Sequence, residues 1–156
     1  MIRIGIVGEI GSGKSYVAKN FGYPAFNADA EVDKLYKKDK KTFNKLKKAL
    51  PNYIFSFPVN KKEISNAILA NQNNLRKIIR IVHLEIRKKM RVFLKKNKKK
   101  KIVVMDIPLL LENKIDEKND ILIFIQSNKV EILKRLKKRK NFNSKLFKIF
   151  KSIQLP

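Results

Sequence analysis

The chain has 156 residues, no cysteine and a single histidine, and 44% of its residues are hydrophobic. This length suits one domain, and the apolar content excludes a globally disordered chain. The lack of cysteine excludes a disulfide scaffold, a thiolate metal site and a cysteine nucleophile, and one histidine excludes a multi-histidine zinc site. No apolar run reaches the roughly 20 residues that a membrane-spanning helix needs. We therefore expect a soluble, cytoplasmic protein with no membrane partner.

The 38 lysine and arginine residues outnumber the 13 acidic residues, which gives a formal net charge of +25. Such a charge favours anionic ligands or partners, and nucleic acid is the obvious candidate. However, the basic residues are mostly lysines spread along the whole chain, together with abundant Asn, Ile and Phe, which A/T-rich codons encode. Proteins that read nucleic-acid bases favour arginine and aromatic side chains on one face. The composition therefore favours phosphate-bearing ligands, and we expect no specific nucleic acid as a partner.

The N-terminal part of the chain alternates strand and helix signals. Residues 2–7 form a short β-branched run that ends at glycine, which is typical of a buried parallel strand. A helix is expected at about residues 14–21, a strand at 23–27 and a second helix at 30–38. Because strands alternate with helices, the sequence predicts an α/β fold with a parallel sheet.

The middle of the chain is predicted to be a helical insertion, about residues 40–97, in a core formed by residues 1–39 and 98–156. Leucine and isoleucine recur here at helical spacing. We expect helices at residues 40–50, 61–70 and 74–96. The loop at residues 52–60 holds three aromatic side chains, which we expect to form local core rather than a platform for a coenzyme. They are Tyr53, Phe55 and Phe57.

The C-terminal part of the chain returns to strand signals. A buried strand is predicted at residues 102–105, directly before Asp106, and another at residues 121–125. Two helices are expected to follow, a strongly basic one at residues 129–140 and another at 144–153. No internal repeat or long linker divides the chain, so a single domain is expected.

Residues 8–15 read Gly-Glu-Ile-Gly-Ser-Gly-Lys-Ser and match the phosphate-loop pattern GxxxxGK[ST]. The motif follows a predicted strand and precedes a predicted helix, which is the context that it requires. Its glycines allow backbone N–H groups to turn toward a phosphate, and the helix N-terminus adds partial positive charge. Lys14 would reach the outer phosphates of a nucleotide, and Ser15 would ligate magnesium. The alternative, a tight turn without a ligand, is disfavoured because strand, loop and helix signals agree.

Beyond this loop, the sequence resembles the dephospho-coenzyme A kinase family over nearly the whole chain. The most discriminating landmark is a Pro-Leu-Leu-x-Glu segment at residues 108–112. Nucleoside monophosphate kinases share the phosphate loop and a basic lid, but they do not usually combine them with this segment. The landmarks are residues 8–15, Asn27-Ala28-Asp29, Ile81-Val82-His83, residues 106–112 and residues 134–139.

The resemblance implies a phosphate-loop kinase fold, in which a parallel sheet flanked by helices carries a helical acceptor-binding insertion and a lid at about residues 128–145. It also implies a reaction: the γ-phosphoryl group of ATP is transferred, with Mg²⁺, to the ribose 3′-hydroxyl of dephospho-coenzyme A in the last step of coenzyme A synthesis. Three other functions remain open: a nucleotide kinase with another acceptor, a polybasic nucleic-acid-binding ATPase, and an inactive fragment.

The motif and the resemblance together give four groups of expected site residues. The groups expected to act in catalysis are Asp29, Lys14 and Arg135. ATP is expected to contact Gly8, Gly11, Ser12, Gly13, Lys14, Ser15, Tyr16 and Arg139. The acceptor is expected to contact Asp29, His83, Pro108, Leu109 and Glu112, and the metal to contact Ser15 and Asp106.

Several of these assignments have structural alternatives. Asp29 is either the base that accepts the hydroxyl proton or the N-cap of a helix that begins at Ala30, and the resemblance favours the base. Asp106 either holds magnesium through water or caps a strand end. Arg135 and Arg139, four residues apart on one predicted helix face, either clamp ATP phosphates or form a solvated face.

The sequence also departs from the usual pattern of the family. Asn27 stands where the family usually has Asp, Leu84 follows His83 where Pro is usual, and Lys61 stands where Arg is frequent. Glu9 replaces a common glycine and brings a carboxylate near the expected phosphate site. His83 lies on an apolar helical stripe, where packing is its commoner role, and only the resemblance makes it an acceptor-site candidate. Family members usually continue for about forty more residues, a last strand and helix, so we expect this chain to lack that C-terminal segment.

Overall fold

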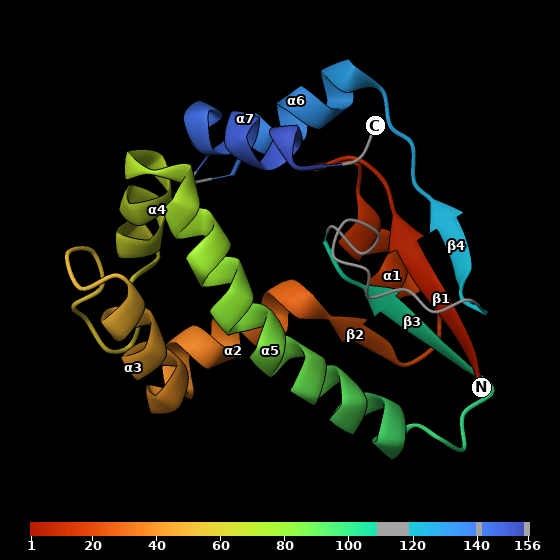
Figure 1. The fold of residues 1–156 in the computed structure, drawn as a ribbon. Helices are drawn as coiled ribbons and strands as arrows, with labels where there is room; N and C mark the ends of the chain where they lie inside the picture. Colours follow the sequence, from red (N-terminus) through yellow and green to blue (C-terminus); the bar gives the residue numbers. More distant parts are fainter. Residues whose placement is uncertain (109–118, 140–141, 155–156) are drawn as a thin grey trace. The chain divides into compact units, whose positions relative to one another are not determined.

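The computed structural model describes residues 1–108, 119–139 and 142–154 (Figure 1). Its centre is a sheet with the strand order β2-β3-β1-β4, in which every neighbouring pair is parallel. The predicted α/β fold with a parallel sheet is therefore confirmed. The elements are β1 (Ile2–Val7), α1 (Lys14–Asn20), β2 (Ala25–Asn27), α2 (Ala28–Lys38), α3 (Lys40–Ala49), α4 (Lys61–Ala70), α5 (Gln72–Lys96), β3 (Ile102–Asp106), β4 (Ile121–Phe124), α6 (Lys129–Lys137) and α7 (Ser144–Ser152).

β1 occupies an inner position in the sheet, between β3 and β4. Ile4 of β1 lies opposite Val104 of β3 and Ile121 of β4. Ile4, Ile6 and Val104 are buried together with Ala18 of α1 and form a hydrophobic core. Because β1 is buried on both faces, its apolar residues form a continuous run rather than an alternating pattern. This firmly held strand carries the phosphate-loop motif at its carboxyl end.

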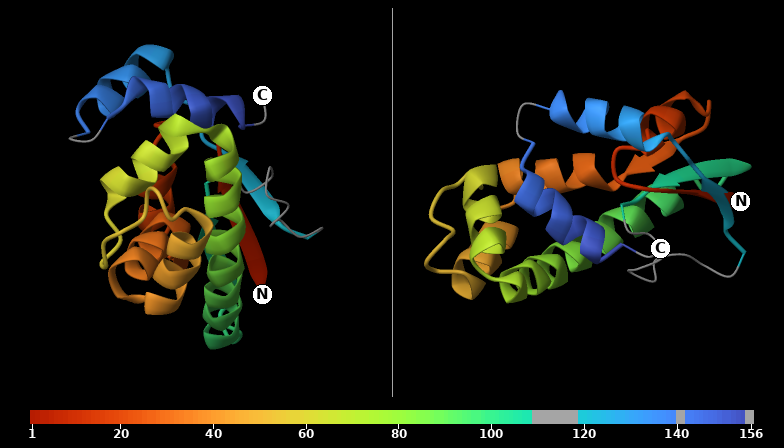
Figure 2. Two further views of the ribbon diagram at one scale, coloured as in Figure 1. Left: turned by 60° about the vertical axis from the view of Figure 1, so that its left-hand side comes forward. Right: turned by 90° about the horizontal axis from the view of Figure 1, so that it is seen from above.

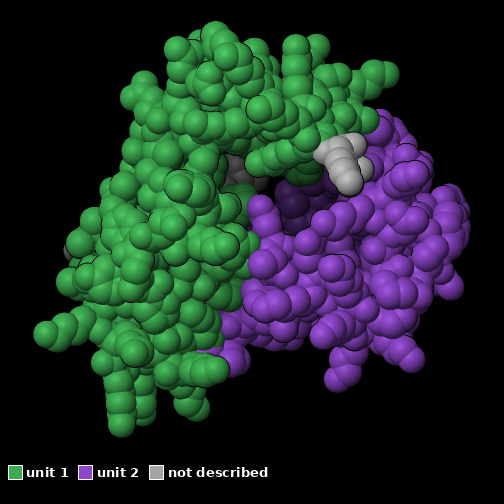
Figure 3. All heavy atoms as spheres, turned by 180° about the vertical axis from the view of Figure 1, so that it is seen from behind, with its two compact units in different colours: residues 1–28, 93–156 green, residues 29–92 purple. Residues whose placement is uncertain are grey.

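Contacts divide the chain into two compact units, which Figure 3 shows in different colours. Unit 1 comprises residues 1–28 and 93–156 and contains the sheet, α1, α6 and α7. Unit 2 comprises residues 29–92 and is helical. The boundaries of the helical insertion and of the lid that we expect from the sequence remain predictions.

The helices of unit 1 lie around the sheet and at its edge. α1 contacts β1, β2 and β3, whereas α6 and α7 lie at the edge formed by the carboxyl ends of the strands (Figures 1 and 2). Ile132 and Leu136 of α6 are buried, and their side chains approach Gly11 of the phosphate-loop motif. α7 has no fully buried residue. The motif is therefore covered by α6, a helix far from it in the sequence.

Unit 2 has its own apolar core, in which Leu46 of α3 and Ile54 of the following loop are fully buried. Asp39 caps α3, because its carboxylate accepts hydrogen bonds from the backbone N–H groups at residues 41 and 42. Glu63 of α4 holds the loop before it, since its carboxylate accepts hydrogen bonds from the N–H groups of Phe55 and Ser56 and from the Ser56 hydroxyl. These polar contacts fix an otherwise irregular segment of chain.

Three local predictions were wrong. The second strand begins at Ala25 rather than at residue 23, since Pro24 has no N–H to donate to a neighbouring strand. The basic helix α6 ends at Lys137 rather than at residue 140. Phe55 is 59% exposed and therefore lies outside the expected local core, whose buried side chains in this loop are Ile54 and Val59, although Phe57 does pack against Phe43, with ring centroids 5.5 Å apart. Within the part of the chain that the structure describes, no helix combines the length and the apolar character needed to cross a membrane.

Candidate active site

The phosphate-loop motif lies between β1 and α1, at the carboxyl edge of the sheet. After β1 the chain continues to β2, at one edge of the sheet, and after β3 it continues to β4, at the opposite edge. The connections therefore leave the neighbouring strands β1 and β3 in opposite directions, and ligands bind at such switch points in parallel sheets. Gly8, Gly11 and Gly13 all have positive φ, at 140°, 88° and 103°. A Cβ atom at Gly8 would collide with the carbonyl oxygen of Ile125 after β4. Only glycine therefore fits where the loop passes this neighbouring chain segment.

The Lys14 side chain folds back over the loop. Its Nζ atom donates to the carbonyl oxygens of Gly8 at 2.8 Å and Glu9 at 2.7 Å. α1 begins at Lys14, and its N-cap, Gly13, has no side chain that could accept from the first turn. The first N–H groups of α1 therefore remain available to an anion, and the helix dipole favours negative charge at this end. The loop offers an ammonium group and backbone donors, which is the set that phosphate binding requires.

The carbonyl oxygen of Ser12 receives two side chains from distant parts of the sequence. The Ser127 hydroxyl donates to it at 2.7 Å, and Nη1 of Arg135 donates at 3.2 Å. Nη1 of Arg135 also donates to the Ser127 hydroxyl at 3.3 Å. The structure thus brings Arg135, an expected catalytic group, to the phosphate-loop motif. Ser127 was not among the expected site residues, although a hydroxyl shortly after the predicted strand at residues 121–125 was a usable signal.

A pocket of about 550 Å³ opens beside the loop. The Ser12 hydroxyl is buried, with the residue 2% exposed, and it has no hydrogen-bond partner among the described residues. Tyr16, on the rim of this pocket, is 76% exposed. The residues that line the pocket are Ser12, Gly13, Tyr16, Val17, Ile125, Ser127 and Arg135. This pocket combines apolar walls with a few polar groups, as small-molecule sites do.

Asp106 and Asn27 end two neighbouring strands of the same sheet. They are register partners in β3 and β2, and Nδ2 of Asn27 donates to Oδ2 of Asp106 at 2.6 Å. Asp106 is 2% exposed. Asn27, where the family usually has Asp, therefore supplies a hydrogen-bond donor to a buried carboxylate. A second carboxylate in this place would repel the first.

Asp29 lies in the first turn of α2, two residues after the end of β2. The suggestion that it is the N-cap of a helix beginning at Ala30 is wrong, because α2 begins at Ala28. The Asp29 side chain is exposed, and a carboxylate in the first turn is favoured by the helix dipole. Asp29 is the first residue of unit 2.

His83 lies half-buried in α5 of unit 2. Burial lowers the pKa of His83 below its ordinary value, and the positive charge of Arg87 lowers that pKa further. The imidazole is therefore neutral at pH 7 and can both donate and accept a hydrogen bond. This state suits contact with an uncharged group of a ligand as well as packing in the helix.

The remaining expected site residues are Arg139, Ser15, Pro108, Leu109 and Glu112. Arg139 lies beyond the end of α6, so the prediction that it shares a helix face with Arg135 is wrong. Ser15 is exposed in the first turn of α1, and Pro108 is half-buried after β3. Leu109 and Glu112 lie outside the described residues.

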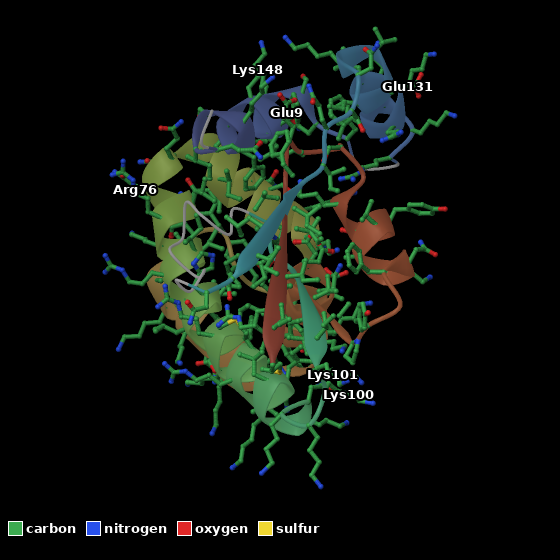
Figure 4. The ribbon with its side chains drawn as sticks, turned by 90° about the vertical axis from the view of Figure 1, so that its right-hand side faces the viewer. Glu9, Arg76, Lys100, Lys101, Glu131 and Lys148 are labelled. Carbon is green, nitrogen blue, oxygen red and sulfur yellow. The ribbon has the colours of Figure 1, made fainter. Side chains whose placement is uncertain are left out.

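The positive charge is not collected around the loop. Figure 4 shows Arg76 of α5, Lys100 and Lys101 before β3, and Lys148 of α7 projecting outward from different elements. Glu9 in the loop is exposed. Basic side chains thus project from several elements of both units, whereas the groups that can hold phosphate come from the loop and from α6.

The sequence is similar to proteins of one family. The family model "CoaE: Dephospho-CoA kinase" matches residues 2–156. A dephospho-CoA kinase of Wolbachia sp. subsp. Brugia malayi (strain TRS) is 33% identical over 158 residues, covering 98% of this chain and 80% of that protein. The dephospho-CoA kinase of Wolbachia pipientis wMel is 32% identical over 157 residues, covering 97% of this chain and 80% of that protein.

Solved structures share the fold. The crystal structure of TT1252 from Thermus thermophilus matches with a TM-score of 0.73 and 24% identity, covering 99% of this chain and 81% of that one. Dephospho-CoA kinase from Campylobacter jejuni matches with a TM-score of 0.59 and 20% identity, covering 97% of this chain and 78% of that one. Together with the complete phosphate-loop motif at the edge of a parallel sheet, the match of the family model to nearly the whole sequence shows that this chain belongs to the dephospho-CoA kinase family.

Proposed function

We propose that this protein transfers the γ-phosphoryl group of ATP to the ribose 3′-hydroxyl of dephospho-CoA and releases CoA and ADP. The observation that carries the proposal is a complete phosphate-loop motif, residues 8–15, built into the sheet of a chain that the dephospho-CoA kinase model matches over residues 2–156. Phosphoryl transfer depends mostly on alignment of the reactants and neutralisation of charge. The loop can provide both for the phosphates of ATP.

Lys14 is the group we assign to the phosphates of ATP. Its ammonium now rests on the Gly8 and Glu9 carbonyl oxygens, and it would exchange these acceptors for phosphate oxygens. Arg135 already lies at the loop through Ser12, and its guanidinium can clamp phosphate oxygens with forked donors. Tyr16 and Arg139 are proposed as further contacts of the nucleotide.

The chain also offers suitable ligands for Mg²⁺. No cluster of three or more His, Asp or Glu side chains that could hold a metal occurs in the described ranges 1–108, 119–139 and 142–154. Mg²⁺ does not need one, because it is usually held by one or two protein groups together with phosphates and water. The Ser15 hydroxyl and the buried Asp106 carboxylate, which Asn27 orients by hydrogen bonding, are the groups that we propose. Bound there, the ion would neutralise charge on the phosphates.

Asp29 is the proposed base. Its carboxylate follows the end of β2 and is exposed, so it is accessible to a ligand hydroxyl. It would orient the 3′-hydroxyl and accept its proton as the bond to phosphorus forms. His83, Pro108, Leu109 and Glu112 are proposed to contact the acceptor.

The test is an assay of ADP release with purified protein, ATP and magnesium. Dephospho-CoA should be phosphorylated, and nucleoside monophosphates should not be. Lys14→Ala should abolish turnover, whereas Lys19→Ala, the same change at an exposed position of α1, should leave it unchanged. Turnover with a nucleoside monophosphate but not with dephospho-CoA would overturn the assignment of the acceptor.

Asp29→Asn tests the base. It should lower kcat by about a hundredfold, the usual size of a general-base effect, while the affinity for ATP stays within a few-fold. The matched control is Asp33→Asn in the same helix, where the carboxylate pairs with Lys61 at the protein surface. Equal turnover in the Asp29 variant and the control would remove Asp29 from the chemistry.

A further inference from the structure

Gln154 contacts the phosphate-loop motif from the other end of the chain. It follows α7, and its backbone N–H donates to the Lys151 carbonyl oxygen at 3.3 Å, which forms the turn after that helix. Its side-chain amide Nε2 donates to the carbonyl oxygen of Gly8 at 2.9 Å, across 146 residues of sequence. Gln154 is half-buried. A neutral donor from the C-terminal part thus reaches the first glycine of the loop.

The Gly8 carbonyl oxygen accepts two hydrogen bonds. One comes from Gln154, and the other comes from Nζ of Lys14 at 2.8 Å. A carbonyl oxygen has two lone pairs, so both are used. The neighbouring backbone also fixes Gly8, since the chain at Ile125 passes too close for a Cβ atom, and the Ile125 N–H donates to the Val7 carbonyl oxygen at 2.8 Å. Gly8 is therefore not free to turn its carbonyl toward a different donor.

These two donors have different tasks when a nucleotide binds. When Lys14 exchanges the Gly8 carbonyl for phosphate oxygens, as assigned above, this half-buried carbonyl loses one of its two donors, and a carbonyl left without a donor is destabilised. The Gln154 side chain is uncharged, so the charge of the phosphates does not attract it away from the Gly8 carbonyl.

We infer that Gln154 is a positioning residue for ATP binding: it holds the Gly8 carbonyl so that Lys14 can be released to the phosphates. The inference rests on the proposed function, because it assumes that the loop binds ATP. It also gives α6 and the turn after α7 a shared role, since Arg135 of α6 holds the Ser12 carbonyl and Gln154 holds the Gly8 carbonyl. Arg135 and Gln154 thereby attach to the loop at two of its carbonyl groups.

The experiment measures the dissociation constant of ATP with magnesium by calorimetry, without dephospho-CoA. Gln154→Glu keeps the shape of the side chain but replaces the donor by an acceptor, and Gln154→Met removes the donor without adding charge. Both should bind ATP about tenfold more weakly, the effect expected for one hydrogen bond. The control, Lys151→Gln, changes the net charge as much as Gln154→Glu does, at an exposed position, and it should bind ATP within twofold of the parent.

Steady-state kinetics provide the second measurement. The hydrogen bond is present in both the ground state and the transition state, so KM for ATP should rise about tenfold while kcat stays within twofold. If the Gln154 variants have a lower melting temperature but an unchanged ATP dissociation constant, the Gln154 hydrogen bond only stabilises the fold, and the inference is overturned. An equal loss of affinity in Lys151→Gln and Gln154→Glu would assign the effect to charge and also overturn it. If the parent itself fails to bind ATP, the proposed function fails first, and the inference fails with it.

Discussion

Replacement of Gly11 by alanine should test how tightly α6 packs on the phosphate loop. Gly11 has φ +88°, and a Cβ atom there would lie 3.1 Å from Cγ2 of Ile132 and 3.1 Å from Cγ of Leu136. Two effects therefore add: the left-handed backbone destabilises an L-residue by about 1–2 kcal/mol, and overpacking against buried side chains by about 1–3 kcal/mol. We expect Gly11→Ala to lower the free energy of unfolding by about 2–5 kcal/mol.

Gly22 provides a matched control. Its φ is +81°, close to that of Gly11, but a Cβ atom there would meet no atom within 4 Å. Gly22→Ala should therefore show the backbone effect alone, about 1–2 kcal/mol, and the difference between the two variants isolates the packing of α6.

Urea denaturation of both variants measures the two free energies, and ATP affinity provides an independent measurement. Gly11→Ala should weaken ATP binding, because the loop and α6 are displaced, whereas Gly22→Ala should not. Equal losses of stability in the two variants would show that α6 is not packed on the loop as described. That result would also remove the structural support for Arg135 at the phosphate site.

Three further predictions concern other parts of the chain. Arg135→Lys keeps the charge but loses the forked geometry, so kcat should fall by about tenfold or more in the ADP-release assay; an unchanged kcat would limit Arg135 to its hydrogen bonds with the Ser12 carbonyl and the Ser127 hydroxyl. Asp120→Ala removes one partner of a buried ion pair, in which Oδ2 lies 3.1 Å from Nη2 of Arg3, and should lower the free energy of unfolding by about 3–5 kcal/mol in urea. Hydrogen bonds from Ser56 and from the backbone outweigh the effect of burial and lower the pKa of Glu63. The stability that Glu63 contributes is therefore present above its unfolded pKa, near 4.5, and is lost as the pH falls through the lower folded pKa. Glu63→Gln should make the melting temperature fall less steeply between about pH 5 and pH 3. An unchanged dependence of the melting temperature on pH would contradict this role of Glu63.

The sequence by itself determined the elements and the family. Residues 2–7, 40–50 and 61–70 carry patterns that depend on local periodicity, and helices or strands occur at or within one residue of these bounds. The phosphate-loop motif is recognisable because its glycines, Lys14 and Ser15 are neighbours in the chain and because the chemistry of phosphate binding requires that spacing. Local interactions of this kind need no knowledge of the rest of the molecule.

Only the tertiary structure decided which distant groups meet at the loop. Ser127, Arg135 and Gln154 reach carbonyl groups of residues 8–12 across more than a hundred residues of sequence. Arg135 was expected at the phosphates, but no spacing in the sequence shows which backbone carbonyl each of these side chains contacts, because a single hydrogen bond to a backbone carbonyl leaves no mark on sequence spacing. The strand order brings Asn27 beside Asp106 in the same way. Pairing of strands that are far apart in the sequence thus decides which residues surround the loop. The loop itself could be identified from the sequence alone.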